Sequence, residues 1–250
     1  MIKKIKKRIK KFFNPTKVNI RKEPVNKDFT AFELEVINKV KDYTMTSQER
    51  IVSLIRSVEY INQNNIEGDI VECGVWKGGS IGACLLTLIK LDKFDKRIWL
   101  YDTFDGMSQP TEQDKDLKGN LASERMKEED VETSWLWAKA EIDIVKNNIN
   151  KFNYPSEKIK YVKGVVEETL KREELPEKIS LLRLDTDWYE STKIELEILY
   201  SKLVPGGILI IDDYGHWEGC RNAVDQFFDK MNFKPFFHRI DYTGRLIIKP

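Results

Sequence analysis

Short apolar runs alternate with helical patterns over most of the chain from residue 69 onward. Seven of these runs have the length and the β-branched and aromatic content that are typical of strands. They cover residues 69–74, 97–102, 158–164, 179–185, 207–213, 234–239 and 244–250. Because helical segments separate most of the runs, we expect a mostly parallel sheet with helices on both faces. The pattern therefore predicts an α/β fold with a doubly wound, seven-stranded sheet.

Helical patterns precede the first strand and fill most of the later intervals. The first covers residues 28–42, and the second opens at Thr46 or Ser47 and continues to Asn64, because apolar residues recur there at helical spacing. Further helices are expected over residues 80–91, 134–150, 190–203 and 218–231.

Residues 103–133 break this alternation. The segment is polar and rich in turn residues, with a dense run of charges over residues 124–132. A structureless insertion of this length in an α/β domain is typical of a lid or a substrate loop, and a disordered surface excursion is the alternative. We therefore predict a basic amino-terminal extension over residues 1–40 and one domain over residues 41–250 that includes this lid.

Charge is distributed unevenly along the 250 residues, although the formal net charge is only +1. Residues 1–22 contain ten Lys or Arg and no acid, so the rest of the chain has a net charge of about −9. An acidic body argues against a nucleic-acid partner and favours a bound cation. Three cysteines without CxxC spacing, Cys73, Cys84 and Cys220, predict a reducing compartment, the cytoplasm.

The extreme amino terminus has the pattern of a basic amphipathic helix. Residues 1–13 place isoleucines and phenylalanines at roughly helical spacing and lysines between them. Such a helix can contact the anionic inner surface of a membrane peripherally. The alternatives are a solvated helix and a helix that packs on a neighbouring subunit of a homo-oligomer. The segment lacks the long apolar core and cleavage site of a secretory signal, so we expect a cytoplasmic protein.

A glycine-containing turn follows the first predicted strand. Residues 72–80 read ECGVWKGGS, with the spacing G-x-x-x-G-G in place of the G-x-G-x-x-G of dinucleotide sites. Glycines allow a ligand to approach the backbone, and the following helix amino terminus favours a small anion such as the carboxylate of an amino acid. Glu72 suits an ammonium group in the same ligand. The alternative is a tight turn without a ligand.

Two further acids follow the second and third strands. Asp102 ends the second strand, where a carboxylate can accept hydrogen bonds from both hydroxyls of a ribose. Glu167 follows the third strand in a turn that could contact an adenine, although a plain strand-to-helix turn is equally consistent with the sequence. Together with the glycine turn, these acids indicate a ligand that contains adenosine.

Four carboxylates follow two neighbouring apolar strands: Asp185, Asp187, Asp212 and Asp213. Crowded carboxylates repel one another unless they are protonated or share a hard cation. Oxygen ligands without a histidine or cysteine pair favour Mg²⁺, Mn²⁺ or Ca²⁺ over zinc. Helix capping is the alternative role for each acid. His216, three residues beyond Asp213, could line an acceptor pocket.

Five motifs in this order resemble the macrocin O-methyltransferase family (the TylF/MycF/NovP type). They are TMTS at 44–47, ECGVWKGGS at 72–80, DTFDGM at 102–107, LDTDWYEST at 184–192, and PGG with DDY at 205–214. The resemblance covers roughly residues 40–230. It implies a Rossmann-like methyltransferase that uses S-adenosylmethionine and a metal ion to methylate a sugar hydroxyl.

The resemblance also implies roles for individual residues. Asp185, Asp212 and Asp213 would ligate Mg²⁺, and Asp187 would be the general base. The predicted lid, which the resemblance does not cover, offers Glu124 as a second candidate for the base, because its acids could contact the acceptor. The residues expected around the cofactor are Thr44, Met45, Glu72, Gly74, Ser80 and Asp102. The acceptor would be a sugar nucleotide, a glycan or a glycosylated metabolite.

Two other functions remain open at this point. A metal-dependent glycosyltransferase could use Asp185, Thr186 and Asp187 as a DxD motif, although the glycine turn and the Asp212–Asp213 pair would then have no role. A non-catalytic scaffold at a membrane is the other alternative, and the complete set of acids argues against it.

Overall fold

The computed structural model describes residues 28–172 and 174–250. The predicted basic helix and its membrane contact, residues 1–13, lie outside the described residues. The chain divides into two compact units, residues 1–31 and residues 32–250. The second unit contains the sheet and the candidate site.

One seven-stranded sheet in the order β3-β2-β1-β4-β5-β7-β6 forms the centre of the second unit. Its strands are β1 (Asp69–Cys73), β2 (Ile98–Asp102), β3 (Ile159–Lys163), β4 (Ile179–Leu184), β5 (Leu203–Ile211), β6 (His238–Arg239) and β7 (Arg245–Ile248). Strands β1 to β5 are parallel, and β7 is antiparallel to both β5 and β6. The predicted mostly parallel, doubly wound sheet of seven strands is confirmed.

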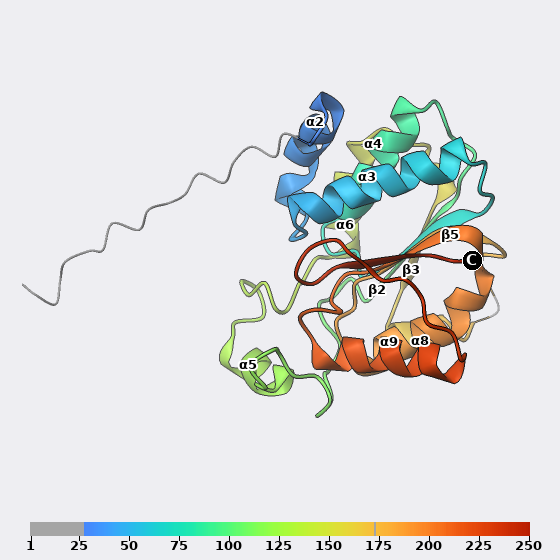
Figure 1. Ribbon diagram of the computed structural model, residues 1–250. Helices are drawn as coiled ribbons and strands as arrows, with labels where there is room; N and C mark the ends of the chain where they lie inside the picture. Colours follow the sequence, from blue (N-terminus) through green and yellow to red (C-terminus); the bar gives the residue numbers. More distant parts are fainter. Residues whose placement is uncertain (1–27, 173) are drawn as a thin grey trace, which may run out of the picture. The chain divides into compact units, whose positions relative to one another are not determined.

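Helices cover both faces of this sheet (Figure 1). The α-helices are α2 (Ala31–Val40), α3 (Gln48–Gln63), α4 (Gly79–Lys90), α5 (Ala122–Glu128), α6 (Ile142–Asn150), α7 (Val166–Thr169), α8 (Tyr189–Leu199) and α9 (Glu218–Lys230). Short 3₁₀ helices are η1 (Lys41–Tyr43), η2 (Ser156–Lys158) and η3 (Tyr200–Lys202). None of the described helices is both long and apolar enough to cross a membrane.

Alternating side chains of the central strands supply two separate cores. In β1, Ile70 belongs to the core under α3 and α4, and Val71 belongs to the core under α8 and α9. Successive residues of a strand point to opposite faces, so a strand covered on both sides is apolar throughout. All five residues of β1 are accordingly buried. The loops at the carboxyl ends of such rigid strands are therefore well positioned to hold a site.

The start of α3 agrees with the sequence prediction, because a capping residue defines it. Ser47 caps α3, and its hydroxyl accepts a hydrogen bond from the backbone amide of Arg50 at 3.2 Å. The expected helix over residues 134–150 is wrong in its first half, because α6 begins only at Ile142. The preceding residues form turns, and the carbonyl of Trp137 accepts a hydrogen bond from the amide of Met107 at 2.9 Å.

Residues 103–133 have structure of their own, in contrast to the expected structureless insertion. The segment contains α5 and two isolated bridges, one of which pairs Asp116 with Trp217 at the amino end of α9. Asp114 is fully buried and accepts hydrogen bonds from the amides of Thr111 and Tyr189, at 2.6 and 2.8 Å. One carboxylate thus joins the insertion to the start of α8.

Replacing Asp114 by alanine is expected to lower the melting temperature by about 5 °C. Two buried amides would lose their acceptor, which costs roughly 1–3 kcal/mol, and about 2–4 °C corresponds to each kcal/mol in a chain of this size. Thermal melting would measure the change, and limited proteolysis would show faster cleavage between residues 103 and 133. The exposed Asp105 in the same segment gives the control Asp105→Ala. Equal melting of the two variants would contradict this anchoring role.

Candidate active site

The strand order creates a natural binding position at the carboxyl ends of β1 and β4. From β1 the chain proceeds to β2 and β3 on one side, and from β4 to β5 on the other, so the connections diverge between them. Ligands of open α/β sheets bind where the connections diverge in this way. The amide of Asp185 donates to the carbonyl of Cys73, and the amide of Asp212 to that of Leu184, both at 2.9 Å. The residues after β1, β4 and β5 are therefore direct neighbours.

A cavity that is partly open to solvent lies over these strand ends. Its walls come from the α2–α3 connection, the turn after β1, the segment before α6, the acids after β4 and β5, and the β6–β7 connection. Its lining residues include Thr44, Met45, Arg50, Gly74, Asp102, Trp135, Leu136, Asp185, Asp187, Asp212, Asp213, His216, Trp217 and Tyr242.

The turn after β1 depends on glycine. Gly74 has a φ of +82°, and a Cβ atom at this position would lie 1.9 Å from the carbonyl oxygen of Asp185. The carboxylate of Asp102 holds the turn by accepting hydrogen bonds from the amides of Val75 and Trp76, at 2.6 and 3.1 Å. The sequence pattern predicts that the backbone of this turn lies close to a bound ligand, and the turn indeed borders the cavity.

Four of the residues that the family resemblance assigns to the cofactor line this cavity: Thr44, Met45, Gly74 and Asp102. Glu72 and Ser80 do not line it, although the hydroxyls of Thr44 and Ser80 lie 3.3 Å apart. Glu72 is buried, and its Oε1 accepts a hydrogen bond from Arg183 at 2.8 Å. Its Oε2 is buried without a partner in the described part of the chain. Burial raises the pKa of Glu72 to about 7, although Arg183 opposes this shift.

A second, smaller cavity adjoins the first and shares Gly74, Asp102 and Asp185 with it. Glu167 lines this second cavity, and its predicted contact with an adenine stays a prediction. Asp102 also accepts a hydrogen bond from the amide of Phe104, at 2.6 Å, so both of its oxygens already bind the loops. A carboxylate can accept about four hydrogen bonds, and the predicted contact of Asp102 with a ribose stays a prediction.

Three of the four predicted acids come together in the first cavity. Asp185, Asp187 and Asp213 each offer an oxygen atom, and these three atoms lie within 4.8 Å of one another. The Oδ2 atom of Asp213 is buried and has no partner among the described residues. Three carboxylates with an unpaired buried oxygen fit a hard divalent cation.

Burial also determines the protonation of this cluster. It raises the pKa of Asp187 to about 7, and that of Asp213 well above its ordinary value, with the neighbouring carboxylates adding to the shift of Asp213. Burial likewise raises the pKa of Asp185, and Arg183 is the main opposing influence. In the absence of a cation, the acids are therefore expected to retain protons near neutral pH.

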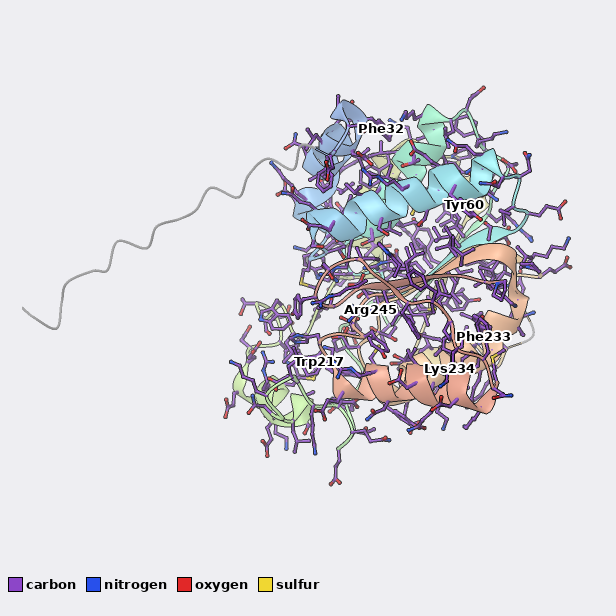
Figure 2. All side chains as sticks on the ribbon, in the orientation of Figure 1. Phe32, Tyr60, Trp217, Phe233, Lys234 and Arg245 are labelled. Atoms are coloured by element: carbon purple, nitrogen blue, oxygen red, sulfur yellow. The ribbon has the colours of Figure 1, made fainter. Side chains whose placement is uncertain are left out.

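Asp212 has different partners from the other three acids. Its Oδ1 lies 2.7 Å from Arg183, and its Oδ2 pairs with Arg50. The structure thus places Asp212 beside the cluster with both oxygens on guanidinium groups, while Asp187 completes the group of three. Trp217, labelled in Figure 2, donates from its indole nitrogen to Asp187 at 3.1 Å. The predicted metal set of Asp185, Asp212 and Asp213 stays a prediction.

Sequence reasoning missed two arginines in this site. Arg183 is buried in β4, and it contacts Asp185 at 2.7 Å in addition to Glu72 and Asp212. Arg50 on α3 contacts Asp241, which precedes β7, at 3.0 Å. The only signal for Arg183 is a charged residue in the otherwise apolar run of residues 179–184. No pattern along the chain indicates Arg50.

Aromatic side chains also line the cavity. The ring of His216 lies 4.8 Å from that of Trp217, and its Nδ1 atom is 2.9 Å from the hydroxyl of Tyr242. Trp135, from the segment before α6, lines the same cavity. Glu124, the second candidate base, is exposed on α5 and lines neither of the two cavities. Among the predicted catalytic residues, the structure brings only Asp187 to the cluster.

Comparisons with known proteins agree with this arrangement. The profile of the family described as Macrocin-O-methyltransferase (TylF) matches residues 4–248. The chain is 30% identical over 223 residues to demethyldecarbamoylnovobiocin O-methyltransferase of Streptomyces niveus, and this alignment covers 86% of this chain and 80% of the relative. It is 29% identical over 202 residues to 8-demethyl-8-(2,3-dimethoxy-alpha-L-rhamnosyl)-tetracenomycin-C 4'-O-methyltransferase of Streptomyces olivaceus. That alignment covers 81% of this chain and 74% of the relative.

The fold comparison gives the same result. The solved structure of the O-methyltransferase NovP superposes with a TM-score of 0.72 at 28% sequence identity, over 86% of this chain and 87% of that chain. These comparisons do not support the glycosyltransferase alternative.

Proposed function

Because the chain belongs to the macrocin O-methyltransferase family, we propose that it transfers the methyl group of S-adenosylmethionine to a hydroxyl of a sugar, with the help of a divalent cation. Membership identifies the chain as an S-adenosylmethionine-dependent O-methyltransferase. Family membership alone does not establish the sugar acceptor or the requirement for a cation. The proposal rests chiefly on one observation, the cluster of Asp185, Asp187 and Asp213 beside the glycine turn in a single cavity.

Two features support a sugar as the acceptor. The name of the relative from Streptomyces olivaceus includes a rhamnosyl group. The cavity in this chain combines carboxylates with the aromatic side chains of Trp135, Trp217 and Tyr242. Aromatic rings suit the apolar face of a pyranose, and carboxylates suit its hydroxyls. The acceptor could be a sugar nucleotide, a glycan or a glycosylated metabolite.

Residues of the cofactor side are suited to an amino-acid ligand. Gly74 leaves room for close approach of a ligand to the backbone of the turn after β1. We assign Thr44, Met45 and Asp102, which line the first cavity, to this ligand, and Glu167 to its adenine end. Glu72 and Ser80 line neither cavity, and only the family resemblance assigns them to the ligand. Binding in this orientation would align the reactive groups and exclude water, which methyl transfer by in-line displacement requires.

The acids divide between binding and proton transfer in this proposal. Asp185 and Asp213 hold the cation, and Asp212 is the third ligand that the family resemblance implies. Such an ion, when bound, would lower the pKa of a sugar hydroxyl. Asp187 accepts the proton of that hydroxyl, and the indole of Trp217 orients its carboxylate.

Ligand binding provides the first test. S-adenosylhomocysteine is expected to raise the melting temperature, and UDP is expected not to. Incubation with labelled S-adenosylmethionine and extracted sugar nucleotides or glycans should then label a sugar-containing product, and chelator treatment should prevent the labelling. Stabilisation by UDP alone would contradict the proposed function.

Cation affinity is expected to increase with pH. Burial raises the pKa of Asp213, a proposed ligand, well above its ordinary value, so a proton occupies this carboxyl near neutral pH and must leave before the cation binds. Mn²⁺ affinity should therefore fall by up to about tenfold for each unit by which the pH is lowered. Titration calorimetry at several pH values would measure the slope. An affinity that does not change between about pH 6 and pH 8 would contradict the shift.

A further inference from the structure

The loop between β4 and α8 contains a threonine between two of the clustered acids. Thr186 follows Asp185 and precedes Asp187. Its Oγ1 donates to the carboxyl group of Glu195, at 3.0 Å from Oε1 and 3.1 Å from Oε2. The backbone carbonyl of Thr186 also accepts two hydrogen bonds, from the amide of Trp188 at 2.7 Å and the hydroxyl of Ser191 at 3.3 Å. Thr186 is thus fixed through both its backbone and its side chain.

Glu195 is an unusual residue for its position. It is fully buried on α8, and its neighbours on the buried side of the helix include Leu196 and Leu199. Burial raises the pKa of Glu195 well above its ordinary value, although Thr186 opposes this shift. No basic side chain among the described residues forms an ion pair with it. A buried acid without a cationic partner is costly compared with an apolar side chain.

The loop that Thr186 stabilises is strained. Asp187 has a φ of +67°, in the left-handed region that residues with a Cβ atom rarely adopt. Such a conformation persists only where neighbouring contacts determine it. The contacts that hold this loop include the hydrogen bond from Trp217 to the Asp187 carboxylate, the ion pair of Asp185 with Arg183 and the contacts of Thr186. Thr186 lies between the two acids, so the directions of Asp185 and Asp187 depend in part on how firmly it is held.

We propose that Glu195 is a positioning residue for the cation site, acting through Thr186 to hold Asp185 and Asp187 toward the position of the ion. This inference rests on the proposed function, because it concerns the proposed cation. It assigns Glu195 a role that cofactor binding does not require, since Glu195 lines neither cavity. It also explains why the buried side of α8 contains Glu195 and not an apolar residue at this position.

A pair of threonine variants tests the hydrogen bond directly. Thr186→Val removes the hydroxyl and keeps the branched shape, whereas Thr186→Ser keeps the hydroxyl. Loss of a partner that orients a metal ligand typically weakens metal affinity by roughly ten- to a hundredfold. We expect Mn²⁺ affinity, measured by titration calorimetry, to be about tenfold weaker in Thr186→Val than in Thr186→Ser. Thr186 lines the second cavity, so the comparison for S-adenosylhomocysteine is between the two variants, whose affinities for this ligand should be equal.

Variants of Glu195 separate positioning from stability. Glu195→Met replaces the acid with an apolar side chain of similar length, and it is expected to melt at or above the wild-type temperature, because burying a polar group is costly. The same variant should bind Mn²⁺ about tenfold more weakly. Glu195→Gln keeps a hydrogen-bonding group and should rescue most of the affinity. Glu197→Gln, on the exposed side of the same helix, is the matched control and should resemble the wild type.

The double variant Thr186→Val with Glu195→Met completes the test. If the two residues act through one hydrogen bond, the double variant should bind Mn²⁺ about as well as either single variant. Additive losses, equal affinities in Thr186→Val and Thr186→Ser, or parallel losses of Mn²⁺ and S-adenosylhomocysteine would each overturn the inference. These results leave the proposed function intact if the wild type binds Mn²⁺ and transfers methyl groups. Failure of the wild type to bind Mn²⁺ would overturn both.

Discussion

Replacing Asp185 by alanine is expected to lower the rate of methyl transfer by at least about a thousandfold, which corresponds to roughly 4 kcal/mol of transition-state stabilisation. Asp185 belongs to the carboxylate cluster, and its backbone lies against Gly74 of the cofactor turn. Alanine keeps this backbone contact and removes the proposed ligand. Affinity for S-adenosylhomocysteine should therefore remain within a few-fold of the wild type.

The measurement compares single-turnover rates with calorimetric affinities for S-adenosylhomocysteine and Mn²⁺. Asp213→Ala should behave in the same way, because the partnerless Oδ2 of Asp213 belongs to the same cluster. Asp229→Ala, an exposed acid on α9, is the control and should have the wild-type rate. A near-normal rate for Asp185→Ala in chelator-treated protein would show that the reaction does not depend on a cation at this cluster.

Replacing Asp187 by asparagine is expected to lower turnover by roughly 10²- to 10⁴-fold, the usual contribution of a general base. Asparagine keeps an oxygen that can accept the hydrogen bond from Trp217, so the loop should keep its conformation. It cannot accept the proton of a sugar hydroxyl at neutral pH. Mn²⁺ affinity should change much less than turnover, because the proposed ligands are Asp185, Asp212 and Asp213.

The same variant decides which acid is the third ligand. If Asp187→Asn loses Mn²⁺ affinity and turnover to the same extent, Asp187 is a ligand, in agreement with its place in the group of three. Asp212→Ala would then retain Mn²⁺ affinity, since its carboxylate would serve only Arg50 and Arg183. If Asp187 is the base, Asp212→Ala should instead lose the ion. The two variants should therefore be measured together.

The sheet and most of the site could be predicted because they follow from local patterns. Buried parallel strands are apolar throughout, and acids placed directly after two such strands must meet when the strands are neighbours. Asp185 and Asp213 are brought together for this reason. The glycine turn was equally visible, since a strand followed by closely spaced glycines has few other structural interpretations.

Features that depend on packing between distant segments could not be predicted. The region around Trp135 and Trp137 has a helical composition, but its backbone instead bonds to Met107 across the cavity edge. The ion pairs of Arg50 depend on helix α3 lying beside the strand ends, and no spacing in the sequence specifies that. Glu195 could be predicted in part. Its spacing from Thr192 and Leu199 places it on the buried side of α8, so the sequence indicates that Glu195 is buried. The sequence does not indicate its hydrogen-bond partner.

The close approach of Gly74 to Asp185 has a consequence for engineering this enzyme. Because even one added carbon at Gly74 would collide with the Asp185 carbonyl, the backbones of the two loops are already in contact there. Substitutions at Gly74 therefore cannot make room for a synthetic sulfonium that has an ethyl or allyl group in place of methyl. Room would have to come from trimming Met45 or Leu136, which also line the first cavity.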